Sequence, residues 1–328
     1  TCADDLAIVK SMTAEFSEHA QGNYFMHTSY QQRATIRHPG LGAWNQKLNG
    51  KLNPTMPGSV FIGKESRFHG SGGFFEPEFG PLAISDPKSG LKHAQSSLRG
   101  DRLQRRIDLS KDLDVEFLER YHSKPIRAYG DMYADAVRLM ESPDLAAFSI
   151  NKEDKKTRQR YGDDPFGQGC LLARRLIESN VRTVEVSLSG WDTHTNNFTS
   201  MPLLCQTMDQ AMGALLEDLE SSGKLDETVV VLTTEFGRTP IVNRNIGRDH
   251  YPQAFTSVLA GGGFKGGYVY GKTSEGAEEV VEKPITIPDF NATIAYALGI
   301  PTDQVLYSPS KRPFSVAHKG QPVLDLFA

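Results

Sequence analysis

Three consecutive segments decide the fold class: TVEVSL at residues 183–188, MPLLCQTMDQAMGALLEDLESSG at 201–223 and TVVVLTTEFG at 228–237. The first and third are short apolar runs rich in β-branched residues, which is typical of buried strands. The segment between them repeats apolar residues at helical spacing and ends at Gly223, a common helix stop. A strand, a helix and a strand in this order predict a parallel pair joined by a crossover helix.

The same alternation continues on both sides of these segments. DLAIVKSM at 5–12 and AFTSVLAGGG at 254–263 are further strand candidates, while GQGCLLARRLIESN at 167–180 and IPDFNATIAYALGI at 287–300 have the pattern of amphipathic helices. Nearly continuous apolar strands are typical of a sheet that is covered on both faces. We therefore predict an α/β protein, a three-layer α/β/α sandwich around a mostly parallel central sheet.

Residues from about 50 to 165 interrupt this alternation of strands and helices. Up to about residue 95 they are rich in Gly, Pro and Ser, with GSVFIG at 58–63 and PLAISD at 81–86 as short strand candidates. VEFLERYHSKPIRAYGDMYADAVRLM at 115–140 has helical spacing with an expected interruption at Pro125. Because no linker bounds this region, we predict one domain over residues 1–328 with a helical and irregular elaboration at about 50–165. A separate domain there is the alternative.

Composition excludes several classes of protein. Lys and Arg number 36 against 40 Asp and Glu, a net charge of −4, which argues against a nucleic-acid-binding surface but leaves room for a small anionic substrate. No run of about 18 apolar residues occurs, so we expect no membrane insertion. The three cysteines, Cys2, Cys170 and Cys205, are too widely spaced for a disulfide framework or a metal-binding knuckle.

Polar side chains gather where the predicted strands end: Asp192 and His194, Glu235 and Arg238, and Arg248, Asp249 and His250. In parallel sheets, functional groups collect at the carboxyl ends of strands. Asp192 and His194 are two residues apart, so in an extended chain both point to the same side. Acids and histidines together suit zinc, manganese or iron better than magnesium or calcium.

Each of these groups also has a structural interpretation. Asp192 could cap a helix, with His194 hydrogen-bonded to backbone. Glu235 and Arg238 could form a plain ion pair, and His250 could be a structural histidine. It is the recurrence of such residues after consecutive strands that favours a metal site. Arg238 is then a candidate for holding anionic oxygens, with Arg248 as the alternative.

Two further motifs could carry chemistry. Near the start, His19, His27, Thr28 and Ser29 lie within a polar stretch, and a hydroxyl beside a metal could act as a nucleophile; ordinary loop residues are the alternative. Gly266 with Gly271-Lys272-Thr273 matches the phosphate-loop pattern. That motif requires a helix beginning at the lysine, and the sequence after Lys272 favours none, so we reject nucleotide binding.

Four long stretches carry a resemblance to a known family: GWDTHTNNF, LDETVVVLTTEFGRTP, GRDHYPQAFTSVLAGGGFKGGYVYG and PITIPDFNATIAYALGI, at 190–198, 225–240, 247–271 and 284–300. In this order they resemble the bacterial family of domain of unknown function 1501, and DDLAIVKSMTAEFSEHAQGNYFMHTSYQQR at 4–33 is similar to its N-terminal third. That family is placed in the alkaline phosphatase-like superfamily, which contains sulfatases, phosphatases and cofactor-independent phosphomutases.

The resemblance implies a metal-dependent hydrolase of phosphate or sulfate esters, with a small anionic ester as substrate. It places Asp192, His194 and His250 as metal ligands, Glu235 as a further carboxylate ligand, and Thr28 at the nucleophile position. Zinc is the expected metal and manganese the alternative. Superfamily members carry an Asp-His pair where this chain has Glu235 and Phe236, and Phe236 cannot coordinate a metal. The resemblance therefore also admits a weakened or relict enzyme, or a non-catalytic binding protein that retains the fold.

The resemblance further implies a segment ahead of Thr1. The superfamily has an acidic metal ligand after its first strand, near a GGPS-like motif, and that segment would precede Thr1. The chain opens with TCADDL and no initiating methionine, which favours a missing N-terminal segment. Family members commonly carry export signals, so we expect a periplasmic or secreted protein.

Overall fold

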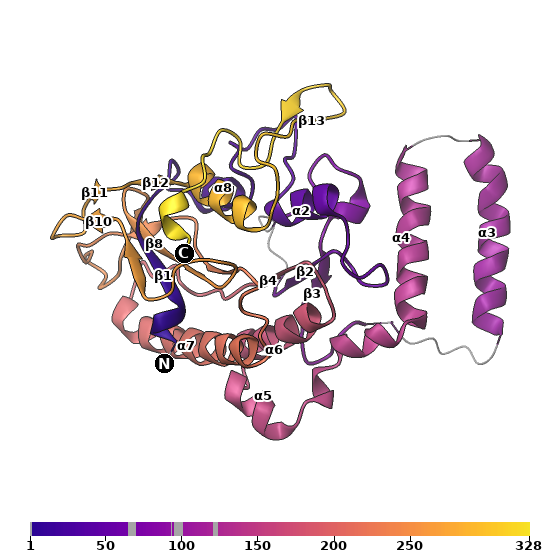
Figure 1. Cartoon of the computed structure of the whole chain (residues 1–328), viewed down its shortest axis with the longest axis horizontal. Helices are drawn as coiled ribbons and strands as arrows, with labels where there is room; N and C mark the ends of the chain where they lie inside the picture. The colour runs from indigo at the N-terminus through magenta and orange to yellow at the C-terminus, as the bar shows by residue number, and fades with distance from the viewer. Residues whose placement is uncertain (1, 65–69, 93, 95–100, 121–123) are drawn as a thin grey trace.

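The structure is a computed structural model, and it describes residues 2–64, 70–92, 94, 101–120 and 124–328. Its strands form two main sheets that lie side by side (Figure 1). The smaller has the order β3-β2-β4, and the larger has the order β12-β1-β8-β5 with β9 also paired to β1. The bounds are β1 Leu6–Thr13, β2 Ser59–Ile62, β3 Leu82–Ile84, β4 Thr183–Val186, β5 Val230–Leu232, β8 Phe255–Ala260, β9 Tyr268–Tyr270 and β12 Ile285–Thr286.

The smaller sheet is parallel throughout. β2 pairs with β3 from Val60 opposite Leu82 and with β4 from Ser59 opposite Thr183. All four residues of β2 are buried. The short apolar runs at 58–63, 81–86 and 183–188 are therefore strands, as predicted.

The larger sheet is mixed, so the predicted mostly parallel central sheet is not confirmed. β8 runs antiparallel to both of its neighbours, with Ile8 opposite Val258 and Leu232 opposite Val258 on the two sides. The reason lies in the connection from β5 to β8, which contains no helix among the residues described. Parallel neighbours need a long crossover, usually a helix, whereas a chain that returns through loops runs antiparallel.

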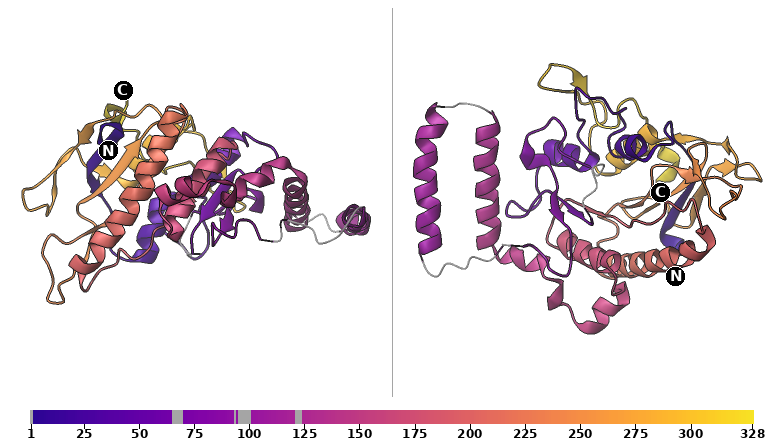
Figure 2. Two further views of the ribbon diagram at one scale, coloured as in Figure 1. Left: turned by 90° about the horizontal axis from the view of Figure 1, so that it is seen from below. Right: turned by 180° about the vertical axis from the view of Figure 1, so that it is seen from behind.

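Helices pack on both sides of the strands (Figures 1 and 2). One group contains α1 His19–Thr28, α2 Leu41–Asn49 and α8 Ile287–Ala297, and the other contains α5 Lys155–Tyr161, α6 Pro165–Glu178 and α7 Asn197–Ser221. α7 connects β4 to β5 and is the crossover helix that the sequence predicts. None of the described helices combines the length and hydropathy that crossing a bilayer requires.

Two long helices, α3 Arg102–Arg120 and α4 Lys124–Glu141, lie antiparallel to each other at one side of the molecule (Figure 1). Pro125 falls in the first turn of α4, so the expected interruption is the start of a new helix. The C-terminal part of α4 joins the body: Leu139 is buried, and Lys51 Nζ lies 2.7 Å from Asp135 Oδ2. This hairpin falls within residues 50–165, where the sequence predicts a helical and irregular elaboration; the division into one domain with an elaboration stays a prediction.

The remaining elements are short. They are β6 Gly237–Arg238, β7 His250–Tyr251, β10 Lys272–Thr273, β11 Val280–Glu282, β13 Leu306–Tyr307, β14 Pro313–Phe314, and the 3-10 turns Ala3–Asp5, Pro77–Phe79, Pro143–Phe148, Ile150–Lys152 and Leu324–Leu326. Lys272 lies in β10, which pairs with β11, so no helix starts at the phosphate-loop match. This agrees with its rejection.

Each sheet has its own hydrophobic core. The smaller sheet packs on α6 through a cluster that includes Val60, Ile62 and Leu171. The larger sheet packs on α8 through a cluster that includes Val9 and Phe290. The cysteines are free thiols, and burial raises the pKa of the Cys170 thiol to about 12.

Candidate metal centre

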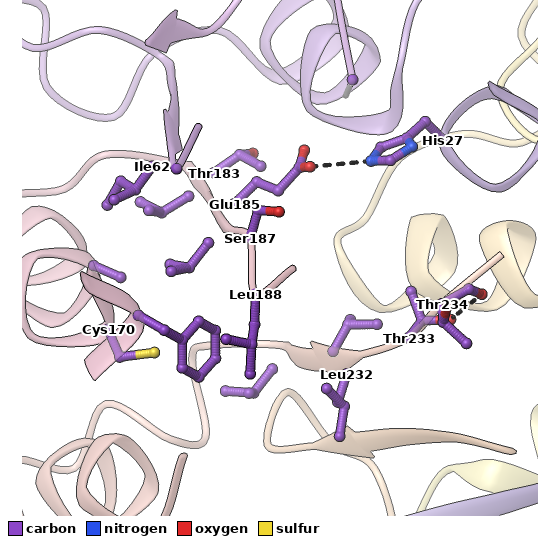
Figure 3. Close-up of a pocket in the computed structure, with 18 of the residues that line it drawn as sticks. His27, Ile62, Cys170, Thr183, Glu185, Ser187, Leu188, Leu232, Thr233 and Thr234 are labelled. Atoms are coloured by element: carbon purple, nitrogen blue, oxygen red, sulfur yellow. Dashed lines mark hydrogen bonds and ion pairs between the residues drawn. The ribbon is translucent and has the colours of Figure 1, made fainter. Parts of the chain in front are cut away.

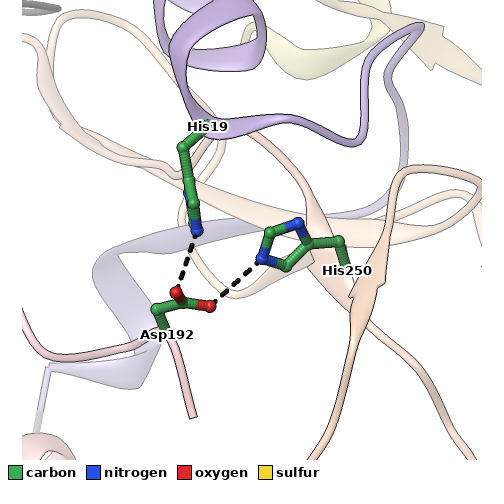
Figure 4. A group of neighbouring side chains, drawn as sticks. All are labelled: His19, Asp192 and His250. Carbon is green, nitrogen blue, oxygen red and sulfur yellow. Dashed lines mark hydrogen bonds and ion pairs between the residues drawn. The ribbon is translucent and has the colours of Figure 1, made fainter. Parts of the chain in front are cut away.

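Four segments of the chain bring polar side chains together, and Figure 4 shows three of these side chains, His19, Asp192 and His250. Asp192 follows β4, Glu235 follows β5, and His250 begins β7, while His19 begins α1. Hydrogen bonds tie these loops together: Arg248 N donates to Thr193 O at 3.0 Å. Gly247 approaches the 194 backbone so closely that a Cβ there would collide with the carbonyl oxygen of His194. A glycine at 247 therefore allows this contact.

The Asp192 carboxylate is the centre of the cluster. Its Oδ2 lies 3.2 Å from His19 Nε2, and its Oδ1 lies 3.1 Å from both His194 Nε2 and His250 Nε2. Arg238 Nη1 donates to Oδ1 at 2.7 Å. Burial acts to raise the pKa of Asp192, but the contacts with Arg238 and His250 outweigh it and hold this pKa well below its usual range. Asp192 is therefore ionised at neutral pH.

The second nitrogen of each histidine has a fixed acceptor. His19 Nδ1 lies 2.6 Å from Glu235 Oε1, and His250 Nδ1 lies 2.6 Å from the carbonyl oxygen of Ser17. His194 Nδ1 lies 2.6 Å from Asp249 Oδ1. Because these oxygens only accept, each Nδ1 carries the proton, and in a neutral ring the lone pair is left on Nε2. Metal-binding histidines are held in this way in proteins.

The Nε2 atoms fit the spacing of metal ligands. His194 Nε2 and His250 Nε2 lie 3.0 Å apart, and at most one proton can lie between them. Bonds of 2.0–2.1 Å in a tetrahedral zinc site place ligand atoms about 3.3 Å from one another. His19 Nε2 is buried and, among the described residues, makes no hydrogen bond of good geometry. A cation in this position would satisfy these lone pairs together with the carboxylate.

Two sets of three ligands overlap here. His19, Asp192 and His250 offer ligand atoms that all lie within 4.8 Å of one another. His194 forms a tighter triangle with Asp192 and His250, at 3.0 and 3.1 Å. Phe236, only 3% exposed, packs its ring against those of His19 and His250, with centroids 5.2 and 4.6 Å away. This ring forms an apolar wall of the site.

Of the predicted site residues, five lie in this cluster. Asp192, His194 and His250 converge, and Arg238 is bound to Asp192. Glu235 is also present, but its carboxylate faces His19 Nδ1 rather than the centre of the cluster. It therefore positions a histidine, whereas the sequence predicted a direct metal ligand.

Thr28 does not join the cluster. Its hydroxyl is buried and donates to Tyr24 O at 2.7 Å, one turn back along α1. Tyr30 N in turn donates to Thr28 Oγ1 at 3.2 Å. These bonds are those of a helix-end hydroxyl, so the predicted nucleophile is not placed where it could attack a substrate at Asp192.

Sequence reasoning did not assign two residues that the structure brings in. His19 stood among the candidates near the N-terminus, but nothing in the local pattern separated it from His27. Asp249 was noted beside His250, and Asn243 Nδ2 and His194 Nδ1 both bond it. These hydrogen bonds lower the pKa of Asp249. Asp249 orients His194 and not its sequence neighbour His250, so the adjacent Asp-His pair did not indicate this role.

Comparisons with known proteins identify the family of the chain. No curated protein sequence matches it. Among solved structures it is similar to the PsFucS1 sulfatase from Pseudoalteromonas sp., at a TM-score of 0.42 and 12% identity. That match covers 98% of this chain and 66% of the sulfatase chain, just under two thirds. The model of the family described as protein of unknown function (DUF1501) matches residues 1–327. The chain therefore belongs to the DUF1501 family.

Proposed function

We propose that the protein binds a divalent transition metal through Asp192, His250, His194 and His19, and hydrolyses a small phosphate or sulfate ester there. Zinc is the expected metal and manganese the alternative. The observation that carries the proposal is the arrangement of three Nε2 atoms around one ionised carboxylate, each with its Nδ1 proton bound to an oxygen. The three-layer, alkaline phosphatase-like architecture that the sequence suggests is part of this proposal.

In this proposal the residues of the cluster have different roles. A bound metal would supply a Lewis acid for the ester oxygens. Arg238 places a guanidinium beside Asp192, where it can bind an anionic oxygen of the substrate. Glu235 Oε1 accepts a hydrogen bond from His19 Nδ1 and so keeps the Nε2 lone pair directed at the centre of the cluster. Water is the attacking group in this proposal, since Thr28 lies elsewhere.

A binding protein without turnover is the second candidate. Phe236 favours it: its apolar ring packs on His19 and His250, whereas the resemblance implies a metal-binding histidine at this place in the sequence. Among the described residues, the two close ligand triads share Asp192 and His250, so together they form a single site. A single metal can hold an anion without supplying the second charge that a two-metal hydrolase uses for the leaving oxygen.

Both candidate functions require a bound metal, so a metal-binding measurement tests them together. Isothermal titration of the metal-free protein with zinc should give one site. Asp192→Asn and His250→Gln should each abolish it, and Glu235→Gln should weaken it about 10–100-fold because His19 loses its orienting acceptor. Asp209→Asn, an exposed acid on α7, is the matched control and should bind as the wild type does. If Asp192→Asn binds zinc as the wild type does, the proposal is wrong.

An activity measurement distinguishes the hydrolase from the binding protein. The zinc- and manganese-loaded protein should release p-nitrophenol from its phosphate or sulfate ester, and Asp192→Asn should remove this activity while Asp209→Asn keeps it. Arg238→Gln should raise KM, because a contact to the anionic oxygens is lost. Stoichiometric zinc binding without release from either ester would instead support the binding protein.

A further inference from the structure

The loop between β6 and β7, residues 239–249, lies beside the candidate metal centre and exposes apolar side chains. Ile241 is 72% exposed and Ile246 is 59% exposed. Phe198, in the first turn of α7, is 55% exposed. A single exposed apolar side chain needs no explanation, whereas several that lie together and are surrounded by polar residues mark a binding surface.

Backbone contacts bring these three side chains together. Ile246 O accepts a hydrogen bond from Asn197 N at 2.9 Å, and Asn197 directly precedes Phe198. Arg248 Nη1 donates at 2.5 Å to the carbonyl oxygen of the proline before Ile241, and its guanidinium carbon lies 5.9 Å from the centroid of the Phe198 ring. Phe198, Ile241 and Ile246 are therefore neighbours, and we call them the apolar rim.

One amide side chain fixes the loop against the metal centre. Asn243 Oδ1 accepts from Asn245 N at 2.9 Å and from Gly247 N at 3.0 Å. Asn243 Nδ2 donates to His194 O at 3.1 Å and to Asp249 Oδ1 at 3.0 Å. The loop is thus bound to the segment that carries His194, and the apolar rim keeps a fixed position beside the cluster.

The backbone of Ile246 is strained. Its φ is +57°, in the left-handed region that is unfavourable for L-residues and a genuine outlier for a β-branched one. Among the described non-glycine residues with positive φ, Ile246 is the only one with a β-branched side chain. Neither backbone preference nor burial accounts for an isoleucine here. Such strain is concentrated at binding and active sites, so it indicates that the side chain contacts a ligand.

The cluster opens toward solvent on the side of this loop. Asp192 and Asp249 are exposed and His194 is half-buried, whereas His19 Nε2 has almost no exposed surface. Asp192 and His19 also line a cavity of about 1750 Å³ that β4 and β5 border (Figure 3), but His194 and Asp249 do not. A ligand that arrives from solvent therefore meets the cluster beside the loop.

We propose that the apolar rim binds the organic part of the substrate, and that the substrate is a phosphate or sulfate ester of a bulky apolar group, an aromatic ring or an alkyl chain. This inference rests on the proposed function. The anionic end is held at the cluster, where Arg238 lies, and the other end extends along the loop. A ring or chain would remove the apolar rim from water, whereas a strongly hydroxylated group would gain no affinity from it.

Binding of two phosphonates tests the substrate class. Phenylphosphonate and methylphosphonate carry the same anionic group and differ only in the organic group. In isothermal titration of the zinc-loaded protein, phenylphosphonate should bind about 10-fold more tightly. Binding is measured rather than turnover, because an aromatic leaving group also speeds hydrolysis by itself.

A substitution in the apolar rim should remove this preference. Ile246→Asn should lower the ratio of the two affinities to about 3-fold and leave the affinity for methylphosphonate unchanged. Val305→Asn, at an exposed apolar residue before β13, is the matched control and should keep the full ratio. A general disturbance of the site would instead weaken both phosphonates together, and that result would contradict the inference.

Thermal unfolding of the metal-free protein provides a measurement without any ligand. Asparagine adopts a positive φ more readily than isoleucine does, so Ile246→Asn should raise Tm by about 2 °C. Val305 has no positive φ, so Val305→Asn should not raise it. A lower Tm for Ile246→Asn would assign this side chain a structural role and overturn the inference.

The remaining outcomes separate this inference from the proposed function. Equal affinities of the wild type for the two phosphonates would overturn the inference and leave the proposed function intact. Binding of neither phosphonate to the zinc-loaded protein would overturn both. Light scattering identifies another occupant: a dimer that Ile246→Asn dissociates would assign the apolar rim to a second copy of the chain and also overturn the inference.

Discussion

His38 is a buried histidine that lies apart from the candidate metal centre and is held neutral. It is 3% exposed, its ring stacks on Tyr30 at 4.4 Å, and its Nδ1 accepts from the Tyr24 hydroxyl at 2.7 Å. Burial lowers its pKa to about 4, and the nearby charges of Arg33 and His318 act in the same direction. Neutral His38 is thus part of the native packing.

This histidine predicts an acid-sensitive component of stability. Its unfolded-state pKa of about 6.5 exceeds the folded value, so the unfolded chain binds the extra proton between these values. Neutral His38 contributes fully to the free energy of unfolding above about pH 6.5. This contribution falls by at most about 3 kcal/mol as the pH drops toward 4. Urea unfolding of the wild type and His38→Phe from pH 4 to 8 measures it. The two curves should converge on acidification; parallel curves would contradict the prediction.

The residues of α1 illustrate what a local pattern can and cannot predict. The stretch around 19–29 was identified as a source of site residues, and His19 does reach the cluster. Thr28 lies nine positions later on the same helix. At 100° and 1.5 Å per residue it faces the opposite side and lies about 13.5 Å along the axis. Choosing between them requires the docking of the helix, which depends on contacts far away in sequence.

At the scale of elements, α6 depends on the residue that caps it. Asp164 precedes Pro165, the first helical residue, and its Oδ1 accepts from Phe166 N at 2.9 Å and Gly167 N at 3.0 Å. A carboxylate at this position satisfies free backbone donors and opposes the positive end of the helix dipole. α6 in turn supplies Leu171 to the core of the smaller sheet.

Removing the cap should therefore destabilise the protein. Asp164→Ala is expected to lower the free energy of unfolding by about 1 kcal/mol. The adjacent Asp163→Ala, at an exposed side chain, should stay within about 0.5 kcal/mol of the wild type. Chemical denaturation of both variants measures the difference. Equal stabilities for the two would show that the hydrogen bonds of Asp164 do not matter to the helix.

Strand identity proved easier to predict than strand direction. The apolar runs that become β1, β4, β5 and β8 were all identified, because periodicity and β-branched residues are local signals. The antiparallel direction of β8 was missed. It follows from the loops between Leu232 and Phe255, which bring the chain back without a crossover, and no pattern within β8 itself encodes it.

For the whole molecule, the class of the fold could be predicted but not the continuity of its sheet. The alternation of strands and helices predicts an α/β protein, and the structure is mixed α/β. β4 and β5 are joined by the helical crossover through α7, yet β4 pairs with β2 and β5 pairs with β8 in different sheets, and no residue in either strand specifies its neighbour. Asp192 and Glu235 follow different strands, yet both contact His19, so the side chains of the candidate metal centre do converge. That they bind a metal stays a prediction.

The hairpin of α3 and α4 has a consequence for the protein in solution. α3 has 19 residues, so it is about 28 Å long, and the pair stands beside the body rather than on it (Figure 2). A compact chain of this length has a radius of gyration of about 20 Å. Small-angle X-ray scattering should give a value several Å larger, with an extended tail in the distance distribution. A profile that fits a sphere would mean that the arm folds back onto the body in solution.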